Sequence, residues 1–123
     1  MMTRIERDEE REERIHNEAI VDAYDAEEQV MGWFYYLADS ITFPFQARCT
    51  QELHKSPLKM GETVTITDMI SDDDSYEMLV EIEFQGRIMG VPLYQLEPID
   101  VDEQTRQVVG DWHYWVARGY EFG

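Results

Sequence analysis

The sequence predicts an α+β fold in which a small SH3-like antiparallel β-barrel is flanked by N-terminal helices and one C-terminal helix. Three observations support this class. Apolar residues alternate with period two through the middle of the chain, they recur at helical spacing on both sides of it, and 43% of all residues are apolar. The 123 residues suffice for one packed core. Residues 1–123 are expected to form a single domain, divided into an acidic helical arm at 1–14, a helical segment at 15–40, the barrel at 41–99 and a C-terminal helix at 103–118.

A first helix is expected over residues 3–24, which contain neither Gly nor Pro. Ile15, Ala19 and Ala23 recur four residues apart and would form its apolar face. The first third of the helix carries alternating charges, whose ion pairs are worth only about 0.3 kcal/mol each. We interpret that part as a solvated arm, with an oligomer contact as the alternative.

A second helix is expected over residues 26–39. Asp25, followed three residues later by Glu28, resembles a capping box and places the break between the two helices. Gly32 costs about 1 kcal/mol relative to Ala inside a helix, which indicates a close approach of this backbone to the sheet.

Four strands are expected, at residues 43–49, 61–69, 78–84 and 88–93, and the two middle ones show the clearest alternation of apolar and polar residues. Gly86 can supply the positive φ that a tight hairpin between the last two strands requires. Such a succession of short antiparallel strands is typical of a small barrel, whose closure protects the strand edges.

A short helical turn at residues 94–97 and an acidic linker at 99–103 follow the last strand. The chain then enters a terminal helix that ends at Arg118, with Trp112 on its apolar side and Gly119 as its stop. We expect this helix to pack beside the N-terminal helices.

The charge balance limits the classes of function. The chain has 27 acidic and 10 basic residues, and its formal net charge is −17. Nucleic acids and anionic membranes are disfavoured as partners because both require a cationic face, whereas cations and basic proteins are favoured. The N-terminus lacks the apolar core of a signal peptide, and the single cysteine, Cys49, is expected to be a buried thiol, so we expect a cytoplasmic protein.

The loop between the two middle strands concentrates carboxylates. Asp72, Asp73 and Asp74 are consecutive, Asp68 precedes them and Glu77 follows them. Two such charges about 6 Å apart repel each other by roughly 0.7 kcal/mol in water. A hard cation relieves this repulsion, since Ca²⁺ takes roughly six to eight oxygen ligands. The alternative, which composition alone favours slightly, is a solvated turn that keeps a sheet edge soluble.

The sequence thus suggests a Ca²⁺ site made of carboxylates. The candidate ligands are first Asp72, Asp74 and Glu77, then Asp73, with Asp39 and Asp68 completing the shell. Asp39 is included because a loop at the end of a strand can lie beside the end of a helix. Neither the segment that starts at Asp72 nor the one that starts at Asp100 has the glycine that an EF-hand requires at its sixth position, so an irregular cluster is expected.

Other polar groups are better explained by structure than by chemistry. Asp100, Asp102 and Glu103 precede a helix, where negative charge interacts favourably with the helix dipole, and this explanation is favoured over a second metal site. Asp111 and His113 are two residues apart on a helix and therefore face different directions, which argues against a catalytic dyad. The sequence contains no phosphate loop or nucleophile motif, and an enzyme is the least supported class.

Several strings in the chain are distinctive, in particular GWFYYL, FPFQARC and DWHYW. Together with EERIHNEAIVDAY, SPLKMGETVTI and VPLYQLEPI, they resemble the CcbP family of calcium-binding proteins, first described in cyanobacteria. The resemblance spans nearly the whole chain beyond the acidic arm. It implies a small acidic cytoplasmic protein that binds Ca²⁺ through surface carboxylates and buffers or sequesters the ion, but it assigns no individual ligand.

Our hypothesis from the sequence is a non-enzymatic Ca²⁺-binding protein, a buffer, whose principal site is the acidic loop. The main alternative is an interaction module in which the same carboxylates dock a basic protein partner. A metal-dependent hydrolase is a weaker third alternative.

Overall fold

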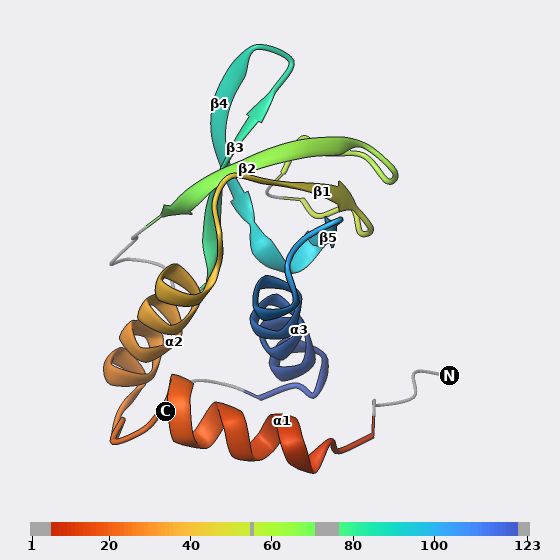
Figure 1. Ribbon diagram of the computed structural model, residues 1–123. Coiled ribbons are helices and arrows are strands. Elements are labelled where there is room, and N and C mark those ends of the chain that lie inside the picture. Colours follow the sequence, from red (N-terminus) through yellow and green to blue (C-terminus); the bar gives the residue numbers. More distant parts are fainter. Residues whose placement is uncertain (1–5, 55, 71–76, 121–123) are drawn as a thin grey trace.

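A computed structural model of the protein describes residues 6–54, 56–70 and 77–120. Its elements form a sheet and a layer of helices, so the α+β class is confirmed (Figure 1). The strands are β1 (Phe45–Cys49), β2 (Thr63–Ile70), β3 (Leu79–Phe84), β4 (Arg87–Pro92) and β5 (Leu96–Ile99). The helices are α1 (Glu9–Arg14), which continues as the π-helical turn η1 (Ile15–Ala19), then α2 (Ala26–Ser40), the 3-10 turn η2 (Leu93–Gln95) and α3 (Glu103–Ala117).

The five strands are antiparallel and lie in the order β4, β3, β2, β1, β5. Within the described residues no pairing joins the edge strands β4 and β5, so the sheet is open and the SH3-like barrel is not confirmed. Sequence patterns missed β5, in which Pro98 lies opposite Ala47 of β1. Proline lacks a backbone donor and is tolerated here because β5 is an edge strand. On β1, Cys49 is a buried thiol, as expected.

The helices lie on one side of the sheet. α2 and α3 extend away from it and pack on each other, and α1 with η1 crosses their far ends (Figure 1). Trp33 of α2 is fully buried, and its ring meets that of Trp112 edge-on at 5.0 Å and that of Trp115 at 5.7 Å. Each aromatic contact of this kind adds about 1 kcal/mol beyond simple burial. None of the helices in the described ranges combines the length and the apolar character that a membrane span needs.

A β-bulge in β2 keeps a carboxylate out of the core. Val64 and Ile66 are buried, and strict alternation would bury Asp68 as well. The pairing with β3 shifts between Ile66 and Asp68, so that Thr67 is an extra residue, Asp68 is exposed and Met69 is buried. β2 therefore approaches the acidic loop with its own acidic residue facing solvent.

The interpretation of the N-terminal charges as a solvated arm is wrong for Arg11, Glu12 and Arg14, although Glu9, Glu10 and Glu13 are exposed. Asp8 begins α1, because its side chain accepts a hydrogen bond from the N–H of Arg11 at 3.1 Å. The helical segment ends at Ala19, five residues earlier than expected, and Asp22 has a φ of +57°. Arg11 and Arg14 point toward α3, where each meets a buried partner about 100 residues away along the chain.

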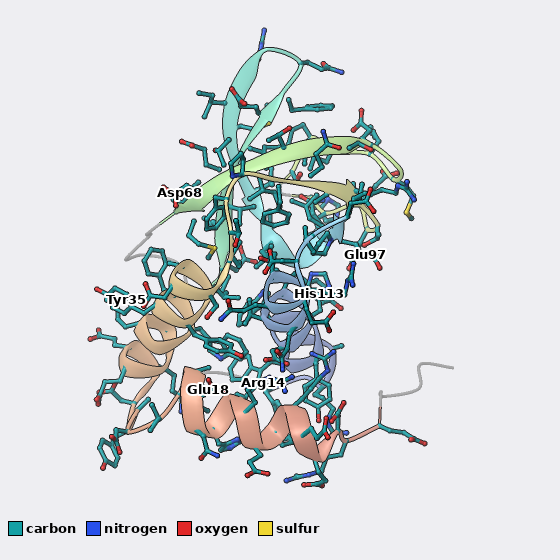
Figure 2. The ribbon with its side chains drawn as sticks, in the orientation of Figure 1. Arg14, Glu18, Tyr35, Asp68, Glu97 and His113 are labelled. Atoms are coloured by element: carbon teal, nitrogen blue, oxygen red, sulfur yellow. The ribbon has the colours of Figure 1, made fainter. Side chains whose placement is uncertain are left out.

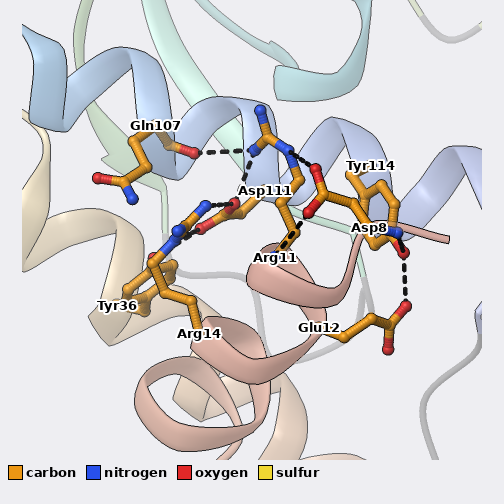
Figure 3. A network of polar contacts seen from close by, with 8 residues as sticks. All are labelled: Asp8, Arg11, Glu12, Arg14, Tyr36, Gln107, Asp111 and Tyr114. Atoms are coloured by element: carbon orange, nitrogen blue, oxygen red, sulfur yellow. Dashed lines mark hydrogen bonds and ion pairs between the residues drawn. The ribbon is translucent and has the colours of Figure 1, made fainter.

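Asp111 on α3 is fully buried at the centre of a polar network (Figure 3). Its Oδ1 accepts from Arg11 Nη1 and Arg14 Nη2, both at 2.7 Å, and its Oδ2 accepts from Arg14 Nε at 2.8 Å and from the Tyr36 hydroxyl at 2.7 Å. The hydrogen bond and charge of Asp111 hold the pKa of Arg14 above its ordinary value. Burial, and then the same carboxylate, raises the pKa of Tyr36, so that its hydroxyl stays protonated and donates.

Glu12 makes a second polar contact at the same interface. Its Oε2 accepts from the Tyr114 hydroxyl at 2.6 Å and from the Tyr120 hydroxyl at 2.5 Å. The Tyr114 hydroxyl in turn accepts from the N–H of Asp8 at 2.9 Å. Burial alone would raise the pKa of Glu12, but the two hydroxyl hydrogen bonds outweigh it and lower the pKa. α1 is thus attached to α3 along its whole length.

The sequence suggested that Gly32 marks a close approach of α2 to the sheet. The structure shows a different neighbour. A Cβ atom placed on it would lie 2.2 Å from the carbonyl oxygen of Ala19, so α2 touches the backbone of η1 at this point. Glycine is required because any side chain would collide with backbone.

Gly32→Ala is expected to lower the free energy of unfolding by more than about 1 kcal/mol, although Ala is the better helix former by about that amount. Urea denaturation measures the change. Glu27→Ala, at an exposed position of the same helix, is the control and is expected to stay within about 0.5 kcal/mol of the natural chain. A midpoint for Gly32→Ala at or above that of the natural chain would contradict the close packing of η1 on α2.

Asp111→Asn is expected to lower the free energy of unfolding by about 3 kcal/mol, because Arg11 and Arg14 would lose the buried countercharge that they share. Chemical denaturation at neutral pH measures this loss. Glu103→Gln is the matched control on the same helix, since Glu103 is exposed and pairs with Arg106 at 3.7 Å; it is expected to cost about 0.5 kcal/mol or less. Equal effects of the two substitutions would show that the network is worth no more than a surface ion pair.

Candidate functional site

The structure describes three of the six candidate metal ligands. The other three lie outside the described residues, namely Asp72, Asp73 and Asp74. Asp39 is exposed in the last turn of α2, Asp68 is exposed on β2 after the bulge, and Glu77 is partly exposed just before β3. Within the described ranges, no three carboxylate, imidazole or thiol groups converge closely enough to hold a metal ion. Asp39, Asp68 and Glu77 therefore do not form a site by themselves.

The strands on either side of the acidic loop bring its two ends together. Ile70, the last residue of β2, pairs with Leu79, the first residue of β3. Paired residues in an antiparallel ladder have Cα atoms about 5 Å apart. Asp68 and Glu77 each lie two residues along the chain from this pair, and α2 contacts β2. The ends of the loop are thus held together by strand pairing, and the placement of Asp39 beside the loop stays a prediction.

Two acidic residues also occupy paired positions on β2 and β3. Asp68 lies on the outer side of β2 (Figure 2), directly opposite Glu81 of β3. Asp68 Oδ1 accepts from the N–H of Met69 at 2.8 Å, and Glu81 Oε2 accepts from the Thr67 hydroxyl at 2.6 Å. Like charges opposite each other in a sheet repel, so these two carboxylates create a negative potential beside the loop.

Other acidic residues serve the helix ends. Asp102 accepts from the Thr105 hydroxyl at 2.6 Å and from the Thr105 N–H at 3.0 Å, and these bonds lower the pKa of its carboxyl group. Asp25 accepts from the N–H of Glu28 at 2.9 Å at the start of α2. The interpretation of both segments as helix starts is confirmed.

His113 is a packing residue. Its ring meets the ring of Tyr94 edge-on at 5.5 Å, and its Nε2 lies 3.3 Å from the carbonyl oxygen of Leu93. Burial lowers the pKa of His113, which favours the neutral ring with Nε2 as donor to that carbonyl. This geometry leaves the imidazole engaged with backbone and aromatic neighbours.

A family model described as calcium binding, and named for CcbP, matches residues 13–116. The chain belongs to the CcbP family. The resemblance carried by the sequence strings is therefore confirmed, and membership in this family supports Ca²⁺ as an ion that the protein binds.

Two solved structures are similar to this CcbP-family chain over nearly its whole length. The crystal structure of Anabaena CcbP has 43% sequence identity and a TM-score of 0.86, and the match covers 98% of this chain and 100% of that one. A calcium-binding protein in its calcium-binding form has 42% identity and a TM-score of 0.82, with the same coverage. A comparison with curated proteins finds no match.

His113 makes the stability of the chain depend on pH in a defined direction. Because burial lowers its pKa below the ordinary 6.5, the unfolded state binds a proton more readily. This contribution to stability is therefore fully present above pH 6.5 and is lost as the pH falls through and below that value.

His113→Gln is expected to reduce the loss of unfolding free energy between about pH 7.5 and about pH 5.5, measured by urea denaturation at both values. His54→Gln is the control, because His54 is exposed and its replacement is expected to leave the loss unchanged. An identical loss in His113→Gln and the natural chain would show that protonation of His113 is not responsible.

Proposed function

We propose that this CcbP-family protein binds Ca²⁺ as a cytoplasmic buffer and has no enzymatic activity. The observation that carries the proposal is the family match over residues 13–116, joined by 42% identity to a protein solved in its calcium-binding form. The net charge of −17 supports it, since a strong negative field raises the local concentration of cations.

The acidic loop and its surroundings are proposed as the principal site. Carboxylate oxygens are the hard donors that Ca²⁺ prefers, so the donor chemistry fits the ion. The pairing of Ile70 with Leu79 supports this choice because it holds the two ends of the loop together. The proposed ligands are Asp72, Asp73, Asp74 and Glu77, with Asp39 and Asp68 to complete the shell.

An irregular site is proposed in preference to an EF-hand. The acidic loop connects two strands, whereas an EF-hand loop connects two helices. The segment that starts at Asp100 has a structural role, since residues 103–117 form α3 and Asp111 binds Arg11 and Arg14. These observations favour a loop that acquires its ligands from neighbouring elements.

Asp72→Asn/Asp74→Asn is expected to weaken Ca²⁺ binding by about tenfold or more, because two charged ligands are lost. Isothermal titration calorimetry with Ca²⁺, and in parallel with Mg²⁺, measures affinity and selectivity. The matched control is Glu81→Gln/Glu83→Gln, which removes the same charge from the solvent side of β3 and is expected to weaken binding by less than about threefold. If both double substitutions weakened binding equally, the overall negative electrostatic field of the protein, and not the acidic loop, would be what holds the ion.

A further inference from the structure

Exposed apolar side chains gather at the turn between η1 and α2. Among the described residues six large apolar side chains are exposed, and four of them lie within residues 21–35. These four, which we refer to as the elbow patch, are Val21 (53% exposed), Tyr24 (84%), Met31 (43%) and Tyr35 (54%). Single exposed apolar residues are ordinary, but a group of neighbours marks an interaction surface.

Two residues of the elbow patch line a shallow hollow, together with Asp22, Glu27 and Glu28. A space of about 390 Å³ lies between the turn and the first half of α2, with Val21 and Met31 among its walls. Met31 and Tyr35 are four residues apart on α2 and therefore share one face of that helix. The side chain of Tyr35 points away from the body of the protein (Figure 2). The hollow thus has an apolar wall that continues along a helix.

The turn that carries the patch has a fixed shape. The carbonyl oxygen of Ala19 sits against Gly32, which fixes η1 on α2. Asp22 adopts a φ of +57°, which non-glycine residues rarely do, and Asp25 caps α2. A surface that is already ordered loses less conformational entropy when a partner binds.

The surroundings of the patch are acidic. Asp22, Asp25, Glu27 and Glu28 are all exposed, and the sequence has no Lys or Arg from residue 15 to residue 47. A second copy of this chain would bring the same charges to the contact, and each copy carries a net charge of −17, so self-association is opposed. Charge complementarity therefore calls for an occupant that is both apolar and basic.

We propose that the elbow patch docks a basic amphipathic helix of another protein. Apolar side chains at helical spacing on that partner would contact Val21, Met31 and Tyr35, while its Lys and Arg side chains would face Glu27 and Glu28. Met and Tyr suit this role because a flexible thioether and a large amphipathic ring adapt to different apolar partners.

The elbow patch and the proposed calcium site lie on the same helix. Met31 is eight residues from Asp39, or about 12 Å along the axis of α2, and Tyr35 is four residues from it, or about 6 Å. Partner binding does not require Ca²⁺ in this proposal, and either proposal can fail without the other.

The test uses a fluorescein-labelled synthetic peptide of Leu and Lys, patterned as an amphipathic helix, and measures its fluorescence anisotropy with the full chain. Met31→Ser/Tyr35→Ser is expected to weaken binding by about tenfold or more. The matched control, Met60→Ser/Ile88→Ser, removes two exposed apolar side chains that lie outside the patch and is expected to leave the affinity within about twofold. All four side chains are exposed, and circular dichroism checks that both variants are folded.

A scrambled peptide of the same composition, which has no apolar face, separates docking from charge attraction and is expected to bind about tenfold more weakly. The proposal is overturned if the patterned peptide does not bind, or if the scrambled peptide binds as tightly. It is also overturned if the control pair weakens binding as much as the patch pair. Sedimentation that shows a dimer of the natural chain, abolished by Met31→Ser/Tyr35→Ser, would assign the patch to a second copy instead.

Discussion

The arrangement of the three helices depends on one buried charge, the carboxylate of Asp111. An ionised group in this position costs several kcal/mol unless donors surround it. Arg11 and Arg14 on α1 and Tyr36 on α2 supply those donors to Asp111 on α3, so a single group joins all three helices. The guanidinium of Arg14 binds both carboxylate oxygens, which fixes direction as well as distance. Donors from two other helices satisfy this charge, and Trp33 is fully buried in the same helix layer.

Local patterns in the sequence predicted most of the fold, and the failures have physical causes. Strands with clear alternation and helices with clear caps were found because their signals lie within the elements themselves. β5 was missed because Pro98 argues against a strand, and only its position at the sheet edge makes it tolerable. The N-terminal charges were misinterpreted because the partners of Arg11 and Glu12 lie about 100 residues away. Gly32 indicated a close contact in α2. Its neighbour, η1, could not be identified from the sequence because the position of η1 depends on the turn that joins it to α2.

The sequence predicted Ca²⁺ as the ion, which the family model supports, whereas the proposed ligands stay a prediction. An excess of carboxylates indicates a hard cation. Composition does not show, however, which carboxylates stabilise the fold instead of binding an ion. Asp25 and Asp102 cap helices, while Glu12 and Asp111 are enclosed by donors. Asp68 reaches solvent only because a bulge changes the alternation of β2. Tertiary structure therefore decides which of the 27 acidic residues are enclosed and which face solvent.

The way α2 is held favours a buffer over a sensor. A sensor needs an element with two packing arrangements that its ligand can shift. α2 is fixed at three successive points: Gly32 sits on η1, Trp33 packs against both Trp112 and Trp115, and Tyr36 donates to Asp111. Moving the helix would break these contacts together, and interiors this tightly packed do not deform gradually. Ca²⁺ binding near the last turn of α2 is therefore expected to leave the packing of this helix unchanged.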